Sequence, residues 1–375
     1  MKILVLGGTG SMGKPLVQLL SYRNEVYVTS RSKRDSIGNV KYIHGNALDK
    51  TFLRKALLTC EWDAIVDFMI YSEEDSLRDN LKLLLEYTKQ YIFISSSRVY
   101  AQTDEKITEE TPRLLDVSKD LEYKKTNEYA LFKAREEDIL LNSGKKNFTI
   151  IRPTITYNDY RLQLGVLEKE NWLYRALQGR SIVFSEDIND KLTTMTYGDD
   201  VAEGIASIIG ENKTLGEIYH VTCPMSLPWS EILNIYLSVL NKHLGRQVPV
   251  LMTEKSTNLS FSKRIYQVIY CRYFNRTFDN SKIAEFCNIR KFTKPQEGLV
   301  RCLENFLKSP KFDSIQWDIE AVNDKVAGEY TPMREIPSIG NKITYICYRF
   351  GMQFLLLPIN ECVRCLLKIK ESFIK

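Results

Sequence analysis

Tyr129 and Lys133 are spaced four residues apart, which would put them on one face of a helix as an acid/base pair. A free tyrosine has a pKa of about 10, too high for a base at neutral pH. A neighbouring ammonium stabilises the phenolate and lowers that pKa. Tyr129 could then take the proton of a substrate hydroxyl while hydride leaves the same carbon, or protonate a carbonyl in the reverse direction. The spacing is common by chance, so this interpretation depends on the elements that carry the pair.

Two serines follow a predicted strand at 91–95, namely Ser96 and Ser97. Ligands of open α/β sheets bind at the carboxyl ends of the strands. A hydroxyl at that end can donate a hydrogen bond to the reacting oxygen and stabilise its charge. We expect Ser96 to do this, with Ser97 as the alternative. The other interpretation is that the serines only end the strand and cap the next helix.

A glycine-rich run follows the first apolar segment, residues 2–6, and fits both G-x-x-G-x-x-G and G-x-G-x-x-G. Glycines allow a tight turn and a close approach of the backbone to a pyrophosphate. The helix that follows directs its free N–H groups at the phosphates. We therefore expect a dinucleotide to bind to Gly7, Thr9, Gly10, Ser11, Met12 and Gly13.

The residues after the second predicted strand, 25–30, indicate which dinucleotide binds. An Asp or Glu there would bond the ribose hydroxyls of NAD, but the sequence reads Arg31-Ser32-Lys33. Arg31 can grip a 2′-phosphate, so NADP is favoured over NAD, with a solvated basic loop as the alternative. We expect Tyr129 and Lys133 to contact the cofactor as well.

An alternation of strands and helices must bring these residues together. Short apolar runs alternate with helical patterns through the first 150 residues, which predicts βαβ units and a parallel sheet with helices on both faces. The predicted strands are 2–6, 25–30, 40–44, 63–68, 91–95, 148–152 and 217–221. The predicted helices are 14–22, 51–59, 76–88, 127–141, 170–178 and 198–209. The fold class is therefore α/β, a Rossmann-type doubly wound sheet.

The predicted domains divide the chain unevenly. Residues 1–155 form the dinucleotide-binding domain, to which 190–222 return. Residues 156–189 and 223–310 form a smaller, mostly helical substrate lobe. A C-terminal extension, 311–375, has no assigned role. Within it, residues up to 340 hold several prolines and are expected to be irregular, and the remainder is expected to form one or two amphipathic helices.

Composition restricts the class of protein. Hydrophobic residues make up 44% and charged residues 26%, and the net charge is only +5, which suits nucleotides without indicating nucleic acid. No signal peptide or apolar run of roughly 18 residues is visible, so we expect a cytoplasmic protein without a membrane span. The 8 cysteines are scattered, as in a reduced protein. Cys362 and Cys365 have redox or zinc spacing but no second ligand pair, so no metal is expected.

Together these motifs resemble the extended short-chain dehydrogenase/reductase superfamily, in its NAD-dependent epimerase/dehydratase group. The resemblance is carried by the glycine run, the serine run up to Tyr100, the Tyr129/Lys133 pair and Arg152-Pro153. It covers residues 1–225 well and nothing beyond 311. It implies NAD(P) binding and chemistry on a nucleotide-linked sugar, with Ser96 polarising the substrate, Tyr129 transferring the proton and Lys133 tuning it. It also suggests a homodimer.

Departures from the family pattern qualify the expected activity. The 4,6-dehydratases have Asp-Glu where this chain has Ser97-Arg98, so that reaction is disfavoured. The family has an acid after the third strand where this chain has Asn46, and the resemblance implies that Asn46 and the following Asp49 border the adenine. The candidates for substrate binding are Ser97, Tyr157, Arg161 and Arg175, because arginines bind diphosphates and aromatic rings stack on bases and sugars. The Asp67-Phe68-Met69 strand end is more like the branch with chloroplast RNA-binding relatives. The sequence thus predicts a sugar-nucleotide epimerase or oxidoreductase; the alternative is a non-catalytic NAD(P)- or RNA-binding relative.

Overall fold

The computed structural model describes residues 1–71, 74–259 and 264–356. The chain forms two compact units. The first comprises Met1–Leu162, Lys191–Ile235 and Phe274–Asn305, and the second comprises Gln163–Asp190, Tyr236–Tyr273 and the chain from Phe306 onward. This division differs from the expected one. Residues 156–162, 223–235 and 274–305 belong to the first unit instead of the substrate lobe. The described residues of the expected extension, 311–356, belong to the second unit.

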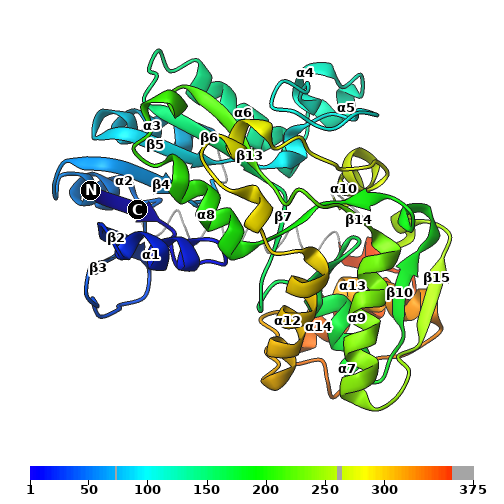
Figure 1. Cartoon of the computed structure of the whole chain (residues 1–375). Coiled ribbons are helices and arrows are strands. Elements are labelled where there is room, and N and C mark those ends of the chain that lie inside the picture. Colours follow the sequence, from blue (N-terminus) through cyan, green and yellow to red (C-terminus); the bar gives the residue numbers. More distant parts are fainter. Residues whose placement is uncertain (72–73, 260–263, 357–375) are drawn as a thin grey trace. The chain divides into compact units, whose positions relative to one another are not determined.

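The first unit contains a seven-stranded sheet in which all neighbouring strands are parallel (Figure 1). In spatial order the strands are β13 (Glu217–Val221), β6 (Phe148–Pro153), β5 (Thr88–Ile94), β4 (Trp62–Asp67), β1 (Lys2–Leu6), β2 (Glu25–Ser30) and β3 (Val40–His44). The strand order reverses between β1 and β4, and ligands of such sheets bind outside the carboxyl ends at that point. The predicted doubly wound parallel fold is confirmed.

Helices cover both faces of the sheet because alternate side chains of each strand point in opposite directions. One face packs against α1 (Gly13–Ser21) and α8 (Gly198–Ile208), and the other against α2 (Lys50–Leu57), α3 (Glu74–Glu86) and α6 (Tyr129–Leu141) (Figure 1). On β1, Ile3 and Val5 belong to the first core, and Leu4 and Leu6 to the second. Burial on both faces explains why Ile3–Leu6 of β1 is a continuous apolar run.

The first unit also contains short helical elements, namely η1 (Ser97–Val99), α4 (Leu114–Val117), α5 (Leu121–Lys124), η3 (Asn212–Thr214), α11 (Ser281–Ala284) and η7 (Ile289–Lys291). Two longer helices, α9 (Trp229–Leu244) and α12 (Pro295–Lys308), begin in the first unit and end in residues of the second. The strands are β7 (Ile155–Tyr157), β11 (Leu192–Thr193), β12 (Met195–Tyr197) and β14 (Leu227–Pro228). Strand β7 pairs with β12, and β11 pairs with β14.

The second unit is mainly helical, with a parallel pair of strands, β10 (Ile182–Ser185) and β15 (Val250–Thr253). Its helical elements are α7 (Lys169–Leu177), η2 (Glu186–Ile188), η4 (Ser256–Leu259), α10 (Ile265–Gln267), η6 (Val268–Arg272), α13 (Trp317–Ala327), α14 (Ile339–Arg349) and η8 (Gln353–Leu355). It also holds the short hairpin β8 (Gln163–Leu164) and β9 (Leu167–Glu168).

The predicted irregular segment between 311 and 340 is wrong, because α13 lies within it. The buried face of α13 carries Glu320 and Asp324 beside Trp317 and Ala321, so its hydrophobic periodicity is interrupted by charge. Helix α14 agrees with a helix in the tail. Cys362, Cys365 and the rest of the tail lie outside the described residues.

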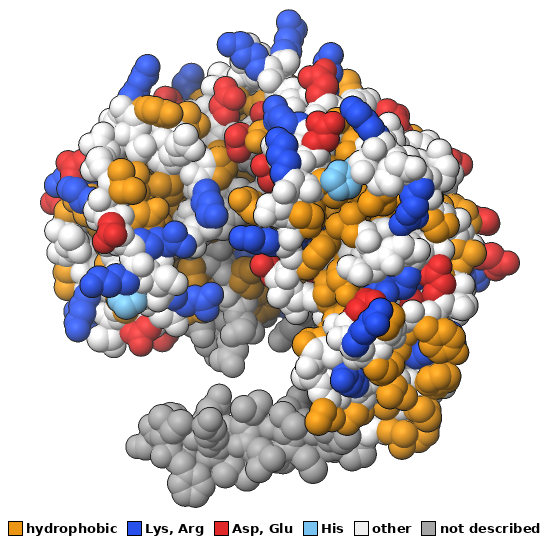
Figure 2. Space-filling view, turned by 90° about the horizontal axis from the view of Figure 1, so that it is seen from below, with side chains coloured by type: hydrophobic (Ala, Val, Ile, Leu, Met, Phe, Trp, Pro, Cys, Tyr) orange, Lys and Arg blue, Asp and Glu red, His pale blue; other side chains and the backbone are white. Residues whose placement is uncertain are grey.

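The surface and the helix lengths bear on possible partners. No helix among the described residues is long and apolar enough to cross a bilayer. On the face shown in Figure 2, Lys and Arg side chains alternate with acidic, hydrophobic and neutral polar side chains. That face therefore has no unbroken basic surface of the kind that a nucleic-acid backbone attracts.

Candidate active site

The turn between β1 and α1 requires glycine for two separate reasons. Gly7 has a φ of +71°, in the left-handed region that favours glycine. A Cβ on Gly13 would lie 2.6 Å from the Cα of Gly8, so the first turn of α1 packs directly on this turn. Gly10 differs from these, because it is exposed and a Cβ there would meet only the carbonyl oxygen of Gly7, at 3.9 Å. The space outside Gly10 is open to a ligand.

The N-terminus of α1 is suited to a phosphate group. Met12 is its N-cap residue and provides no side-chain hydrogen bond. The N–H of Lys14 donates to the carbonyl oxygen of Gly10 at 3.0 Å and Pro15 has no N–H, so the N–H of Gly13 is left for another acceptor. Thr9 and Ser11 are half-buried in the same turn, and the side chain of Asn158 donates to the carbonyl oxygen of Ser11 at 3.3 Å. The residues predicted to hold the dinucleotide thus form one contiguous cradle, which fits a pyrophosphate.

The residues predicted to recognise the adenosine half are also exposed. Arg31 follows β2, and the sequence from 31 to 34 contains no carboxylate. A ring nitrogen of His44 lies 3.1 Å from the carbonyl oxygen of Arg31. This contact involves only the main chain of Arg31, and the residue is exposed. Asn46 is exposed after β3, and its side-chain oxygen accepts from the N–H of Leu48 at 3.2 Å.

Tyr129 and the serine turn are held together by Arg98. Tyr129 is the first residue of α6 and is 41% exposed. Arg98, in η1, forms an ion pair with Glu128, the residue that caps α6. The centre of the Arg98 guanidinium lies 5.3 Å from the centre of the Tyr129 ring. The end of β5 and the start of α6 therefore meet at the predicted acid/base residue.

Both serines of the predicted pair are buried. Ser96 caps η1, and its Oγ accepts from the N–H of Arg98 at 3.2 Å. That bond uses a lone pair of the hydroxyl and leaves its proton for another acceptor. The carbonyl oxygen of Ser97 accepts from the guanidinium of Arg276. The capping role that the sequence left open is observed for Ser96, and it is compatible with donation to a substrate oxygen.

Lys133 points into the protein. It is 3% exposed, and its Nζ lies 2.9 Å from Oε2 of Glu136 and 4.7 Å from the centre of the Phe93 ring. Phe93 on β5 is paired with Asp67 on β4, and Asp67 is paired with Leu6, which precedes Gly7. The ammonium therefore lies over the carboxyl ends of the strands that border the glycine turn.

The model of the NAD dependent epimerase/dehydratase family matches residues 3–222. The chain belongs to this family. A UDP-N-acetyl-alpha-D-glucosaminuronate decarboxylase from Bacillus cytotoxicus is 22% identical over 351 residues, covering 86% of this chain and 99% of the relative.

Solved structures show the same fold at low sequence identity. UDP-glucuronic acid 4-epimerase from Bacillus cereus, in complex with UDP-glucuronic acid and NAD, has a TM-score of 0.62 and 16% identity, over 82% of this chain and 99% of that one. UDP-glucose 4-epimerase from Bifidobacterium longum, in complex with NAD+ and UDP, has a TM-score of 0.61 and 18% identity, over 83% and 99%. These likenesses support the fold of this family member.

Glu137 joins three elements of the site and was missed by the sequence analysis. Its carboxylate accepts from Arg152 of β6 through Nε at 2.8 Å and Nη2 at 2.7 Å. It also accepts from the hydroxyl of Ser95 at 2.6 Å. Glu136 was missed too. Both acids follow Lys133 by three or four residues and so share its face of α6, which was the only signal in the sequence.

Tyr157, predicted to bind substrate, lies in the core. It is 0% exposed, and a Cβ on Gly298 of α12 would lie 2.0 Å from its hydroxyl oxygen. Burial raises the pKa of Tyr157 well above its usual range. Arg161 lies in the loop that follows, and it is exposed. That loop adjoins the glycine turn, since Lys14 lies 5.5 Å from the centre of the Tyr160 ring. Arg161 therefore stays a candidate for substrate binding, and Tyr157 does not.

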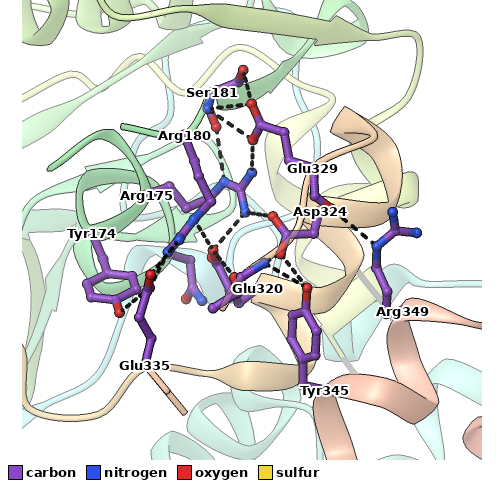
Figure 3. Close-up of polar contacts among 12 residues, drawn as sticks. Tyr174, Arg175, Arg180, Ser181, Glu320, Asp324, Glu329, Glu335, Tyr345 and Arg349 are labelled. Carbon is purple, nitrogen blue, oxygen red and sulfur yellow. Dashed lines mark hydrogen bonds and ion pairs between the residues drawn. The ribbon is translucent and has the colours of Figure 1, made fainter. Parts of the chain in front are cut away.

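Arg175 also has a different role from the predicted one. It is completely buried, and its guanidinium lies 2.7 Å from each of three carboxylates, those of Glu320, Asp324 and Glu329 (Figure 3). A substrate phosphate has no access to it. The partners lie about 150 residues later in the chain, as the separation of 149 for Asp324 illustrates, so no local pattern indicated them.

Proposed function

We propose that this family member is an NAD(P)-dependent epimerase or oxidoreductase acting on a nucleotide-linked sugar, with Tyr129 as the acid/base. The observation that carries the proposal is the arrangement at the strand ends. Tyr129 adjoins the serine turn through Arg98, and Lys133 of the same helix lies over β5, beside the strands that lead to the glycine cradle.

The residues divide the chemistry among them. The Tyr129 phenolate accepts the proton of the substrate hydroxyl, and Ser96 donates a hydrogen bond to the same oxygen. The Lys133 ammonium stabilises the phenolate. An NAD(P) held by the glycine turn would supply the hydride acceptor, which is the cofactor chemistry that an epimerase and an oxidoreductase of this kind have in common.

The named relatives support the substrate class. The decarboxylase is named for a UDP-linked sugar acid, and the two epimerase structures contain UDP-glucuronic acid or UDP. We extend that class to this chain, with Arg161 as the candidate contact for a substrate phosphate. Elimination of water is not included, because Ser97 and Arg98 provide no acid after Ser96. A cytoplasmic homodimer stays a prediction.

For the cofactor we favour NADP. The structures named above contain NAD, whereas this chain has Arg31 at the end of β2 and no carboxylate between 31 and 34. An exposed guanidinium at this point suits a 2′-phosphate, which it can bind through two parallel hydrogen bonds.

The test of the proposal is Tyr129→Phe, assayed with UDP-glucose and UDP-glucuronic acid by cofactor absorbance and by product analysis. Loss of the acid/base should lower kcat by roughly 10²- to 10⁴-fold, while NADPH binding, followed by fluorescence, should be retained. Tyr22→Phe, at a residue 73% exposed, is the control. Unchanged turnover in Tyr129→Phe would refute the assignment.

A further inference from the structure

A buried polar cluster lies behind Lys133, on the side away from solvent. It contains two carboxyl groups, Asp67 at 1% exposure and Glu136 at 0%, together with Lys133 itself at 3%. Two phenols, those of Tyr71 and Tyr91, are also part of it. Groups of this kind are seldom buried without a compensating arrangement, and the proposed chemistry above uses only Lys133.

Asp67 is well provided with hydrogen-bond donors. Its Oδ2 accepts from the hydroxyls of Tyr71 at 2.8 Å and Tyr91 at 2.7 Å, and its Oδ1 accepts from the N–H of Met69 at 2.8 Å. Burial raises the pKa of Asp67, and these three bonds act against that rise. Burial and the Asp67 charge raise the pKa of both phenols well above their usual range, so they remain donors. Three donors to one carboxylate stabilise its anion.

Glu136 has a poorer set of partners. Its Oε2 forms an ion pair with Nζ of Lys133 at 2.9 Å, but neither carboxylate oxygen has a partner in hydrogen-bonding geometry among the described residues. Burial raises the pKa of Glu136 to about 7. Lys133 opposes that rise, while the negative charges of Asp67 and Glu137 add to it. Glu137 itself is occupied by Arg152.

The charges of the cluster balance only if one carboxyl is protonated. With both carboxyls ionised, two negative charges share the single ammonium of Lys133 in a buried site. An uncompensated buried charge costs several kcal/mol. Because Asp67 has three donors and Glu136 has only Lys133, the proton belongs on Glu136.

We propose that Glu136 is a positioning residue that holds Lys133 and, by taking up or releasing one proton, sets the net charge that acts on Tyr129. The inference rests on the proposed roles of Tyr129 and Lys133. While the O–H bond of Glu136 is intact, the charges of Asp67 and Lys133 balance and the cluster has no net charge. When that proton passes to solvent, the cluster gains one negative charge, which disfavours the Tyr129 phenolate.

The first experiment measures the ionisation of Tyr129 without any substrate. Ultraviolet titration of tyrosinate in the full-length protein, minus the same titration of Tyr129→Phe, isolates this residue. In Glu136→Gln, which keeps a polar group but cannot ionise, Tyr129 should ionise at a pH lower by about one unit, the smallest shift expected from one nearby charge. Asp79→Asn removes an exposed carboxylate paired with Lys50 and should cause no shift. Superimposable titrations of the parent and Glu136→Gln would overturn the proposal.

A second measurement observes the proton directly. Infrared difference spectra of the parent minus Glu136→Gln at pH 6 should contain the carbonyl band of a protonated carboxylic acid, which should disappear as the pH rises above 8. A carboxylate band throughout would overturn the proposal. So would a lower melting temperature of Glu136→Gln with unchanged titrations, because that result indicates a structural role alone.

Failure of the proposed function is distinguishable from failure of this inference. If no sugar nucleotide is turned over but Glu136→Gln shifts the Tyr129 titration, the inference stands and the reaction class is wrong. If Tyr129→Phe abolishes turnover but neither Glu136 measurement responds, the function stands and the inference is wrong. With an active substrate, the pH profile of kcat/KM should change shape in Glu136→Gln, whereas a structural defect would only scale it.

Discussion

Burial divides the arginines of this chain into two groups with different roles. Arg152 and Arg175 are buried and each is paired with carboxylates. Arg31 and Arg161 are exposed beside the glycine cradle or in the loop that adjoins it. A guanidinium keeps its charge in either environment, so its type alone does not indicate whether it stabilises the fold or binds a ligand. Only the exposed arginines remain candidates for phosphate contacts.

At this scale we predict that Arg31→Ala weakens NADPH binding much more than NADH binding. A charge-assisted hydrogen-bonding pair contributes roughly 1.5–3 kcal/mol, or about 10- to 100-fold in Kd. NADH has no 2′-phosphate, so its binding does not depend on this contact. Fluorescence titration with both reduced cofactors measures the ratio. Arg23→Ala, an exposed arginine after α1, is the control. An equal effect on the two cofactors would remove Arg31 from phosphate recognition.

At the scale of elements, α13 is attached to α7 through charges as well as through apolar packing. Glu320 and Asp324 are one turn apart on α13 and both contact Arg175 of α7. Arg180, in the loop after α7, adds ion pairs with Glu320 and Glu335. Tyr345 of α14 donates to Asp324 at 2.6 Å (Figure 3). The three helices therefore depend on one another for their buried polar groups.

We predict that Arg175→Met destabilises the protein by about 3–5 kcal/mol, because it leaves buried carboxylates without their cation. Urea unfolding followed by far-ultraviolet circular dichroism and by tryptophan fluorescence measures the change. The matched control is Arg334→Met, at an exposed residue of the same unit, which should change stability by no more than about 0.5 kcal/mol. A loss in Arg175→Met no larger than that of the control would show that the ion pairs contribute little.

At the scale of the whole molecule, chain segments far apart in sequence meet at single polar residues. His220 on β13 is 0% exposed, and its Nδ1 lies 3.3 Å from the hydroxyl of Tyr100. The main-chain N–H of His220 donates to a carboxylate oxygen of Glu109 at 3.0 Å, and the ring Nε2 lies 2.5 Å from the carbonyl oxygen of Asp279. Burial lowers the pKa of His220 to about 4 from an ordinary 6.5, so the folded protein holds it neutral.

This predicts a loss of stability in acid. The pKa of His220 is about 6.5 in the unfolded chain and about 4 in the folded chain. Between these pH values the unfolded chain binds a proton at His220 and the folded chain does not. The stabilisation is therefore complete above pH 6.5 and decreases as the pH falls between those values, by about 3 kcal/mol in all. Melting temperatures across this range should fall less steeply in His220→Gln than in the parent. His243→Gln, at an exposed histidine, should follow the parent; an identical slope for His220→Gln would contradict the prediction.

The amino-acid sequence by itself determined the parallel sheet and the ligand-binding turn. Strands β1, β2, β3 and β13 lie where predicted. Each contains a short run of apolar residues, and in β1 four consecutive residues are buried. The positive φ of Gly7 and the close packing of Gly13 on Gly8 involve only residues that are near one another in the chain. The start of α6 at Tyr129 is also close to the predicted one. These features are local, and a local pattern is what a single sequence records.

Only the tertiary structure decided which polar side chains are buried and with what. The partner of Arg175 lies 149 residues away in the chain. Tyr157 is covered by a helix that begins at Pro295. The charge of Lys133 acts on Asp67 only because β4, β5 and α6 are brought together. Helix α13 was missed because its buried face is half charged and depends on distant arginines. The free energy of a buried charge depends on its neighbours in space. The residues adjacent to that charge in the sequence do not indicate which residues those neighbours are.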